Sequence, residues 1–260
     1  MSQAMIWARS LLFNLLFFGI TFVIAIITIP TLVMPRRAAL AMTQLWARLV
    51  IWALRWSVGV KVEIRGWENL PPGGVVIAAK HQSAFDTIIW LSLLHEPAYV
   101  MKKELLRIPL YGWHARKAGM IPVDREGGGA ALRGMLRAAT ARVAAGRQVV
   151  IFPEGTRTPV GQRVSYQPGV VAIAAGTGAP VVPVATDSGR VWGRRHFIKR
   201  PGMIRISLLP PLPPGLNRAR LLTALETQIE GETDRLMAEP QAGPIAAIPT
   251  GQPAVDKSVD

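Results

Sequence analysis

The apolar positions divide the chain into three parts of different pattern. The N-terminal quarter is rich in apolar residues at helical spacing, and the middle alternates short apolar runs with helical patterns. The last twenty-two residues are rich in Pro, Ala and Gly, a composition typical of disorder at a chain end. We therefore predict a helical segment at 1–58, a folded domain at 59–238 and a disordered tail at 239–260.

The first part is predicted to associate with a membrane through two helices. Residues 11–33 carry no charge and, at about 1.5 Å per residue, can reach across a bilayer core. A cleaved signal peptide is a weaker interpretation, because its apolar region spans about 7–15 residues. Pro30 and Pro35 should end this helix. A second helix at 37–57 has a basic stripe and several tryptophans, which is typical of the membrane interface.

Two membrane arrangements are compatible with this pattern. The segment could form one span plus an interfacial helix, or a hairpin that enters a single leaflet. A buried hairpin in a soluble protein is the less favoured alternative, because no acidic residue occurs before Glu63.

The middle of the chain is predicted to be α/β, with a mixed sheet flanked by helices. Apolar runs typical of buried strands lie at 60–64, 75–79, 98–101, 120–123, 148–152, 180–185 and 203–209. Helical patterns occur at 87–94, 109–117, 130–145, 168–177 and 217–237. Alternation of this kind indicates strands covered by helices on the sheet faces.

The charge balance predicts an anionic partner. Thirty Lys and Arg against sixteen Asp and Glu give a formal net charge of +14, with a pI near 11.3. Nucleic acid, a phospholipid surface or phosphorylated substrates would each attract such a protein. The apolar fraction of 50% and the mean hydropathy of +0.28 favour the membrane over nucleic acid. The chain has no cysteine, which excludes disulfides, thiolate metal sites and a cysteine nucleophile.

A histidine and a carboxylate occur together after the predicted strand at 75–79. On one continuous helix, His81 and Asp86 would lie about 140° apart, so they can meet only if His81 precedes the helix and Asp86 is in its first turn. Ser83 and Asp86 match a pattern that starts helices. His81 would then be a general base oriented by Asp86. The alternative is that Asp86 is only a helix cap and His81 only a loop residue.

Two further loops after predicted strands carry polar groups, at 124–125 and 154–157. Ligands of α/β sheets bind beyond the carboxyl ends of strands, so the three loops are expected to share one pocket. Arg125 and Arg157 have the fork geometry that suits a phosphate, although a single arginine in so basic a chain is more often a surface charge. Gly155 would let the backbone approach a ligand closely.

Other chemistries fit the sequence less well. It contains no G-x-S-x-G, no G-x-x-x-x-G-K-[ST] and no H-E-x-x-H pattern. His95, His114 and His196 have no companions at metal-ligand spacing, so we expect structural or surface roles for them.

Four short blocks resemble those of the glycerophospholipid acyltransferases, in family order over about residues 60–210. They are the H-x-x-x-x-D block at Lys80–Asp86, the block ending in arginine at Gly119–Arg125, the block Phe152–Arg157 and the proline block Val182–Val184. Lys80 replaces an Asn that is frequent in the family, and Pro122 replaces an aromatic residue. Both departures affect the prediction of which head group the acceptor carries more than the prediction of which reaction is catalysed.

The resemblance implies acyl transfer from a thioester, either acyl-CoA or acyl carrier protein, to the sn-2 hydroxyl of lysophosphatidic acid. His81 would deprotonate this hydroxyl and Asp86 would hold His81. The resemblance further implies substrate contacts from Arg125, Glu154, Gly155, Thr156, Arg157 and Lys102. No metal or other cofactor would be required, because an alcohol with a matched base can attack a thioester directly.

Two alternatives remain open at this stage. A related acyltransferase could act on a different lyso-lipid or on glycerol 3-phosphate. A non-catalytic basic protein that binds anionic lipid or nucleic acid would explain the charge but not the four blocks. The acyltransferase hypothesis predicts membrane phospholipids and the acyl donor as partners, without nucleic acid. It also predicts the bacterial inner membrane as the location, with the catalytic domain on the cytoplasmic side.

Overall fold

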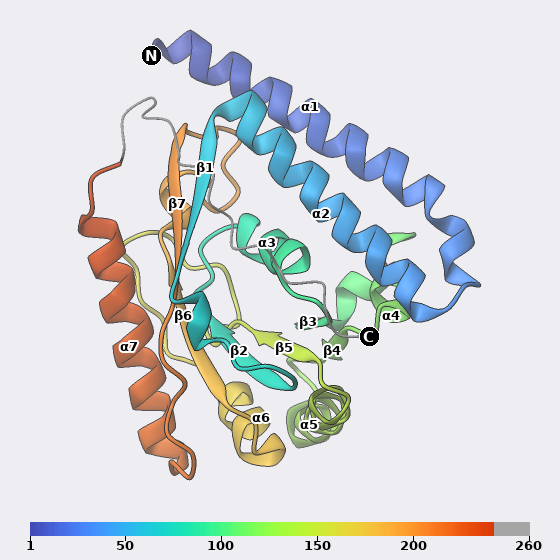
Figure 1. The fold of residues 1–260 in the computed structure, drawn as a ribbon, viewed down its shortest axis with the longest axis vertical. Helices are drawn as coiled ribbons and strands as arrows, with labels where there is room; N and C mark the ends of the chain where they lie inside the picture. The colour runs from blue at the N-terminus through green and yellow to red at the C-terminus, as the bar shows by residue number, and fades with distance from the viewer. Residues whose placement is uncertain (242–260) are drawn as a thin grey trace.

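The computed structural model describes residues 1–241 and contains a seven-stranded sheet with helices on both faces (Figure 1). The strands are β1 (Val60–Arg65), β2 (Val75–Ala79), β3 (Pro97–Lys102), β4 (Ile121–Val123), β5 (Gln148–Ile151), β6 (Val181–Thr186) and β7 (Gly202–Leu208). Their order in the sheet is β1-β7-β6-β2-β5-β3-β4. Neighbours from β6 to β4 are parallel, whereas β7 is antiparallel to β6 and parallel to β1. The predicted mixed α/β sheet is confirmed.

The helices form a layer on each face of this sheet (Figure 1). They are α1 (Gln3–Ile27), α2 (Arg36–Val58), α3 (Phe85–Leu93), α4 (Tyr111–Lys117), α5 (Gly128–Ala144), α6 (Gly169–Thr177) and α7 (Arg218–Ala238). The central strand β2 alternates between the two resulting cores, because successive side chains of a strand point to opposite faces. Ile77 belongs to the core shared with α2 and α3, and Val76 belongs to the core shared with α5, α6 and α7. All five β2 residues are buried.

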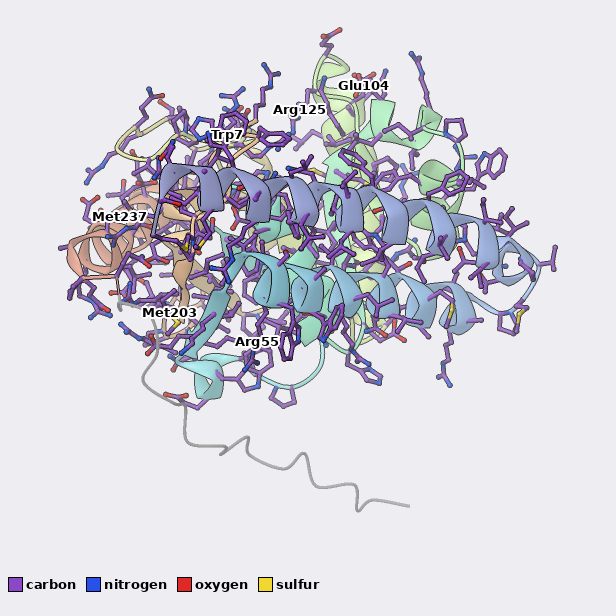
Figure 2. All side chains as sticks on the ribbon, turned by 90° about the horizontal axis from the view of Figure 1, so that it is seen from above. Trp7, Arg55, Glu104, Arg125, Met203 and Met237 are labelled. Carbon is purple, nitrogen blue, oxygen red and sulfur yellow. The ribbon has the colours of Figure 1, made fainter. Side chains whose placement is uncertain are left out.

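The helices α1 and α2 lie side by side as a hairpin (Figures 1 and 2). Helix α1 begins at Gln3, earlier than the predicted apolar stretch, and it ends at Ile27, before the short 3₁₀ turn η1 (Ile29–Leu32). By length and composition it is the one described helix that could cross a membrane. Its outer side exposes large apolar side chains, with Phe18 and Phe22 about two-thirds exposed.

Helix α2 is only partly the interfacial helix that its sequence pattern predicts. Trp52 and Trp56 are exposed, as expected at a membrane interface. The arginines of the predicted stripe, Arg37, Arg48 and Arg55, are exposed as well. Gln44, the fourth member of that stripe, instead donates a hydrogen bond to the Leu94 carbonyl at 2.9 Å. Next to the stripe, Arg36 forms an ion pair with Glu96 at 2.6 Å. The contacts of Gln44 and Arg36 join α2 to the sheet domain.

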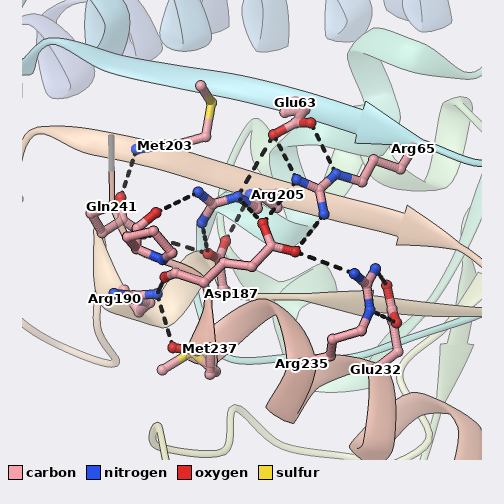
Figure 3. A network of polar contacts seen from close by, with 12 residues as sticks. Glu63, Arg65, Asp187, Arg190, Met203, Arg205, Glu232, Arg235, Met237 and Gln241 are labelled. Atoms are coloured by element: carbon pink, nitrogen blue, oxygen red, sulfur yellow. Dashed lines mark hydrogen bonds and ion pairs between the residues drawn. The ribbon is translucent and has the colours of Figure 1, made fainter. Parts of the chain in front are cut away.

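The segment expected to be a disordered tail starts with residues that contact the sheet. Glu239 forms an ion pair with Arg65 at 2.6 Å, and the Gln241 side chain accepts a hydrogen bond from the Met203 amide at 2.8 Å. Both belong to a polar network around the buried Arg205, which pairs with Asp187 at 3.0 Å (Figure 3). The packed domain therefore extends to at least residue 241, beyond the predicted boundary at 238. Residues 242–260, the rest of the predicted tail, lie outside the described residues.

Candidate active site

Neighbouring parallel strands bring the predicted residues to one edge of the sheet. In the order β2-β5-β3-β4, the carboxyl ends lead into His81, the 152–157 loop, Lys102 and Arg125. Because these strands are parallel, the segments that follow them emerge on the same side. The strand topology thus places the three predicted loops along one edge.

His81 and Asp86 are in contact at the start of α3. The His81 Nδ1 atom lies 3.3 Å from Asp86 Oδ2, and Asp86 is 3% exposed. The same oxygen accepts hydrogen bonds from the amides of Gln82 and Ser83, each at 2.7 Å. The Ser83 hydroxyl accepts from the Phe85 amide at 3.1 Å. Asp86 therefore binds the amides at the start of α3 and also faces His81, so a position at the helix start does not exclude contact with His81.

This contact determines which nitrogen of His81 is available for chemistry. A carboxylate at Nδ1 favours the tautomer that carries its proton on Nδ1. The opposite nitrogen, Nε2, then keeps a free lone pair that can accept a proton. The His81 side chain is 12% exposed, so the imidazole is shielded but can still be reached.

The loop after β5 holds His81 from three directions. The His81 amide donates to Glu154 Oε2 at 2.8 Å, and the His81 carbonyl accepts from the Thr158 amide at 2.7 Å. The Phe152 ring stacks on the imidazole with centroids 4.1 Å apart and an interplanar angle of 22°. These contacts fix both the peptide and the ring plane of His81.

Gly155 permits the turn on which this loop depends. Its φ of +68° lies in the left-handed region, and an added Cβ would be 3.1 Å from Gln167 Cγ. Its amide donates to the Phe152 carbonyl at 3.0 Å. These contacts show that Gly155 turns the chain.

Glu154, on the same loop, is also a predicted substrate contact. Its side chain is fully buried, and its Oε1 atom forms an ion pair with Lys80 Nζ at 3.0 Å. Burial raises the pKa of the Glu154 carboxyl to about 7, while the charge of Lys80 acts in the opposite direction. One oxygen of Glu154 faces Lys80 and the other accepts a hydrogen bond from the His81 amide, so Glu154 supports the backbone of His81 from the protein interior.

The remaining predicted residues are more accessible. Arg125 (labelled in Figure 2), Thr156 and Lys102 are exposed, and Arg157 is half-buried. Lys102 lies 3.9 Å from Glu104, which is a loose contact. Within residues 1–241, neither arginine forms an ion pair with a carboxylate. Their guanidinium groups are therefore available to an anionic ligand.

The other histidines have the structural or surface positions expected. His114 contacts the carbonyls of Leu110 and Thr28 at 2.8 and 3.1 Å, and it thereby connects α4 to the end of α1. His95 and His196 are exposed. In the described part of the chain, no three His, Asp or Glu side chains are grouped so that they could hold a metal ion.

Sequence reasoning missed two residues behind the site, Tyr166 and Glu230. Both contact a cluster that contains Lys80, which the sequence marked only as a departure from the family pattern. A lysine that follows a buried apolar strand needs a carboxylate partner if it is itself buried, and this signal was present in the sequence. The partner itself could not be identified, because Glu230 is 150 positions away in the chain.

Comparisons with known proteins agree with this site. The family model described as Acyltransferase matches residues 61–187. The 1-acyl-sn-glycerol-3-phosphate acyltransferase of Pseudomonas aeruginosa is 36% identical over 197 residues, which are 75% of this chain and 76% of that protein. The human 1-acyl-sn-glycerol-3-phosphate acyltransferase alpha is 29% identical over 171 residues, 64% of this chain and 59% of that protein.

A solved structure shows the same fold. The crystal structure of the 1-acyl-sn-glycerophosphate (LPA) acyltransferase PlsC from Thermotoga maritima superposes with a TM-score of 0.72 at 25% identity. The match covers 89% of this chain and 97% of that one. With the paired His81 and Asp86 at the sheet edge and an N-terminal apolar helix, these similarities show that the chain belongs to the O-acyltransferase family that includes the 1-acyl-sn-glycerol-3-phosphate acyltransferases.

Proposed function

We propose that this protein transfers a fatty acyl chain from an acyl thioester to the sn-2 hydroxyl of 1-acyl-sn-glycerol 3-phosphate, giving phosphatidic acid. The observation that carries the proposal is the contact of His81 Nδ1 with the buried Asp86, which leaves Nε2 for the acceptor hydroxyl. The relatives named above are 1-acyl-sn-glycerol-3-phosphate acyltransferases, which supports this acceptor.

The proposed reaction proceeds in two proton-balanced steps. His81 Nε2 takes the hydroxyl proton while the oxygen attacks the thioester carbonyl carbon, and Asp86 stabilises the resulting imidazolium. The tetrahedral intermediate then collapses, the carbon–sulfur bond breaks, and the imidazolium proton goes to the leaving thiolate. The ester and the free thiol are the products, and neither step uses a metal or a resident cofactor.

The acceptor phosphate is proposed to bind to the cationic groups near the other strand ends. Arg125 and Arg157 supply guanidinium groups that pair with no carboxylate of the described chain, and Lys102 and Thr156 add a further charge and a hydroxyl on the same sheet edge. Guanidinium groups bind phosphate in a bidentate manner. A carboxylate at this site would repel the phosphate. The Glu154 side chain is buried in the protein interior, so its charge does not face the proposed phosphate site.

The proposed setting is the cytoplasmic side of the bacterial inner membrane. Acceptor and product are both lipids, and α1 exposes a row of large apolar side chains. The formal charge of +14 would attract anionic phospholipids and an acidic donor, whether acyl-CoA or acyl carrier protein.

A panel of acceptors tests the proposal. Wild type and His81→Ala would be assayed in detergent with lysophosphatidic acid, other lyso-lipids and glycerol 3-phosphate, each with acyl-CoA and with acyl carrier protein. We expect turnover with lysophosphatidic acid in the wild type and none in the variant. A preference for another acceptor would keep the chemistry and replace the substrate. Transfer to no acceptor, or full activity of His81→Ala, would contradict the mechanism.

The phosphate site is tested separately through Arg125→Ala. Loss of one charge-assisted hydrogen bond of about 1.5–3 kcal/mol should raise the acceptor KM by about 10–150-fold. Arg163→Ala is the matched control, because within residues 1–241 this exposed arginine pairs only with Asp234 on α7. An acceptor KM that changed no more in Arg125→Ala than in the control would remove Arg125 from the phosphate site.

A further inference from the structure

A buried cluster of charged groups lies behind His81. Lys80 Nζ is 3.0 Å from Glu154 Oε1 and 2.6 Å from Glu230 Oε1. The side chains of Lys80, Glu154 and Glu230 are 1%, 0% and 5% exposed, respectively. The Tyr166 hydroxyl donates to the same Glu230 oxygen at 2.9 Å. The four residues come from the end of β2, the loop after β5, the segment before α6, and helix α7.

The side chains of this cluster can adopt only one arrangement, because each of its charged groups is buried away from water and needs its partner. A buried ammonium is tolerated only when carboxylates surround it, and a buried carboxylate needs a cation or hydrogen-bond donors. Lys80 supplies the cation to both carboxylates, and Tyr166 supplies a donor to Glu230. Displacing any member would leave another buried group without its partner.

The cluster reaches His81 by two routes. The oxygen of Glu154 that does not face Lys80 accepts a hydrogen bond from the His81 amide at 2.8 Å. Lys80 also directly precedes His81, and its own amide donates to the Val184 carbonyl at 2.8 Å. The backbone of Lys80 and His81 is thus held by the Lys80 side chain, by the neighbouring strand β6 and by Glu154.

We propose that Lys80, Glu230 and Tyr166 form a positioning unit for the general base. In this unit the Lys80 ammonium fixes Glu154, and Glu154 fixes the His81 peptide so that Nε2 meets the acceptor hydroxyl. The proposal rests on the proposed role of His81 as base. It gives α7 a part in catalysis, although α7 lies outside residues 61–187, which the family model matches.

The test asks whether Lys80 acts through Glu154. Lys80→Met, Glu154→Gln and the double variant would be assayed for kcat and for both KM values in detergent. Each single substitution should lower kcat by about 100-fold, the cost of a small misplacement of a catalytic group, with KM values within about twofold of wild type. Because both changes break one chain of contacts, the double variant should be no more than about threefold slower than the slower single variant.

Independent effects would overturn the proposal. If the two losses multiplied to about 10⁴-fold, Lys80 would not act through Glu154. Wild-type kcat in Lys80→Met would exclude any positioning role. The His81→Ala variant separates this outcome from failure of the proposed function. A His81→Ala enzyme with full activity would refute the role of His81 as base. If His81→Ala were inactive and the losses of Lys80→Met and Glu154→Gln multiplied in the double variant, only the positioning unit would be refuted.

Two further variants distinguish a specific loss of catalysis from a loss of folding. Lys199→Met removes another buried lysine, one that contacts Asn14 on α1 instead of the cluster, and it should leave kcat unchanged. If Lys80→Met did not fold, Glu230→Gln would replace it, because glutamine keeps the shape and an acceptor oxygen for Lys80 and Tyr166. A kcat about tenfold below wild type with unchanged KM values is expected for Glu230→Gln, and a wild-type kcat there would contradict the proposal.

Discussion

The substitution Asp86→Asn isolates the charge that faces His81. Asparagine has nearly the same shape, and its side-chain oxygen can still accept the amide hydrogen bonds from Gln82 and Ser83 that start α3. What the variant loses is the negative charge 3.3 Å from His81 Nδ1. The change therefore tests electrostatic stabilisation of the imidazolium separately from helix capping.

The magnitude follows from the distance and the burial. Unit charges 3.3 Å apart attract by about 5 kcal/mol at an effective dielectric constant of about 20. If His81 carries about half of a positive charge in the transition state, Asp86 stabilises that state by about 2.5 kcal/mol relative to the neutral base. At 1.36 kcal/mol per tenfold, kcat should fall by about 70-fold.

The assay is acyl transfer in detergent at saturating donor and acceptor, with both KM values measured. We expect the loss in kcat, while the KM values change little, because the interaction strengthens as the proton moves to His81. Asp234→Asn is the chemically matched control, since among the residues that the structure describes this exposed aspartate on α7 pairs only with Arg163. Circular dichroism and thermal unfolding would verify that α3 is retained.

Two results would refute this reasoning. A folded Asp86→Asn enzyme with wild-type kcat would show that the carboxylate charge does not assist the base. A complete loss of activity, equal to that of His81→Ala, would show that Asp86 acts mainly by holding the ring in place, and that the Coulombic treatment is insufficient.

Three other outcomes are expected. The pKa of the Glu154 carboxyl is raised to about 7 in the native state, against 4.5 in the unfolded chain. Between these pH values the native state keeps a proton that the unfolded chain loses. The free energy of unfolding should therefore fall by up to about 3 kcal/mol as the pH rises from 4.5 to 7. Urea unfolding of wild type and Glu154→Gln should reveal this as a pH-dependent difference, and a constant difference would contradict the raised pKa. Gly155→Ala should cost about 1–2 kcal/mol in thermal unfolding, because alanine at φ +68° is strained and approaches Gln167; an unchanged Tm would mean that the loop relaxes. Replacing Phe18 and Phe22 together by serine should weaken vesicle binding on the order of 10²–10³-fold in a flotation assay, at about 2 kcal/mol for each ring, with kcat in detergent unchanged. Unaltered flotation would show that this side of α1 does not contact lipid.

The sequence by itself determined the elements and the identity of the candidate base. Apolar runs and helical spacing identified the strands and helices because burial of one face imposes those periods on the chain. The separation of His81 from Asp86 placed one in a loop and the other in a helix, which the structure confirms. The charge and the apolar first helix pointed to a membrane lipid, and the family comparisons agree with that class of substrate.

Only the tertiary structure decided what surrounds His81. The burial of Glu154 and the left-handed turn at Gly155 were not predicted, because spacing within a loop does not show which side chains face the interior or where the backbone turns. The contacts of residues 239–241 with β1 and β7 depend on a network around Arg205 that no local pattern reveals. Local sequence patterns report on neighbours within about one turn or one strand, whereas Lys80 meets Glu230 only because sheet order and the packing of α7 bring them together. A buried charge needs a partner, but the folded chain alone selects which residue provides it.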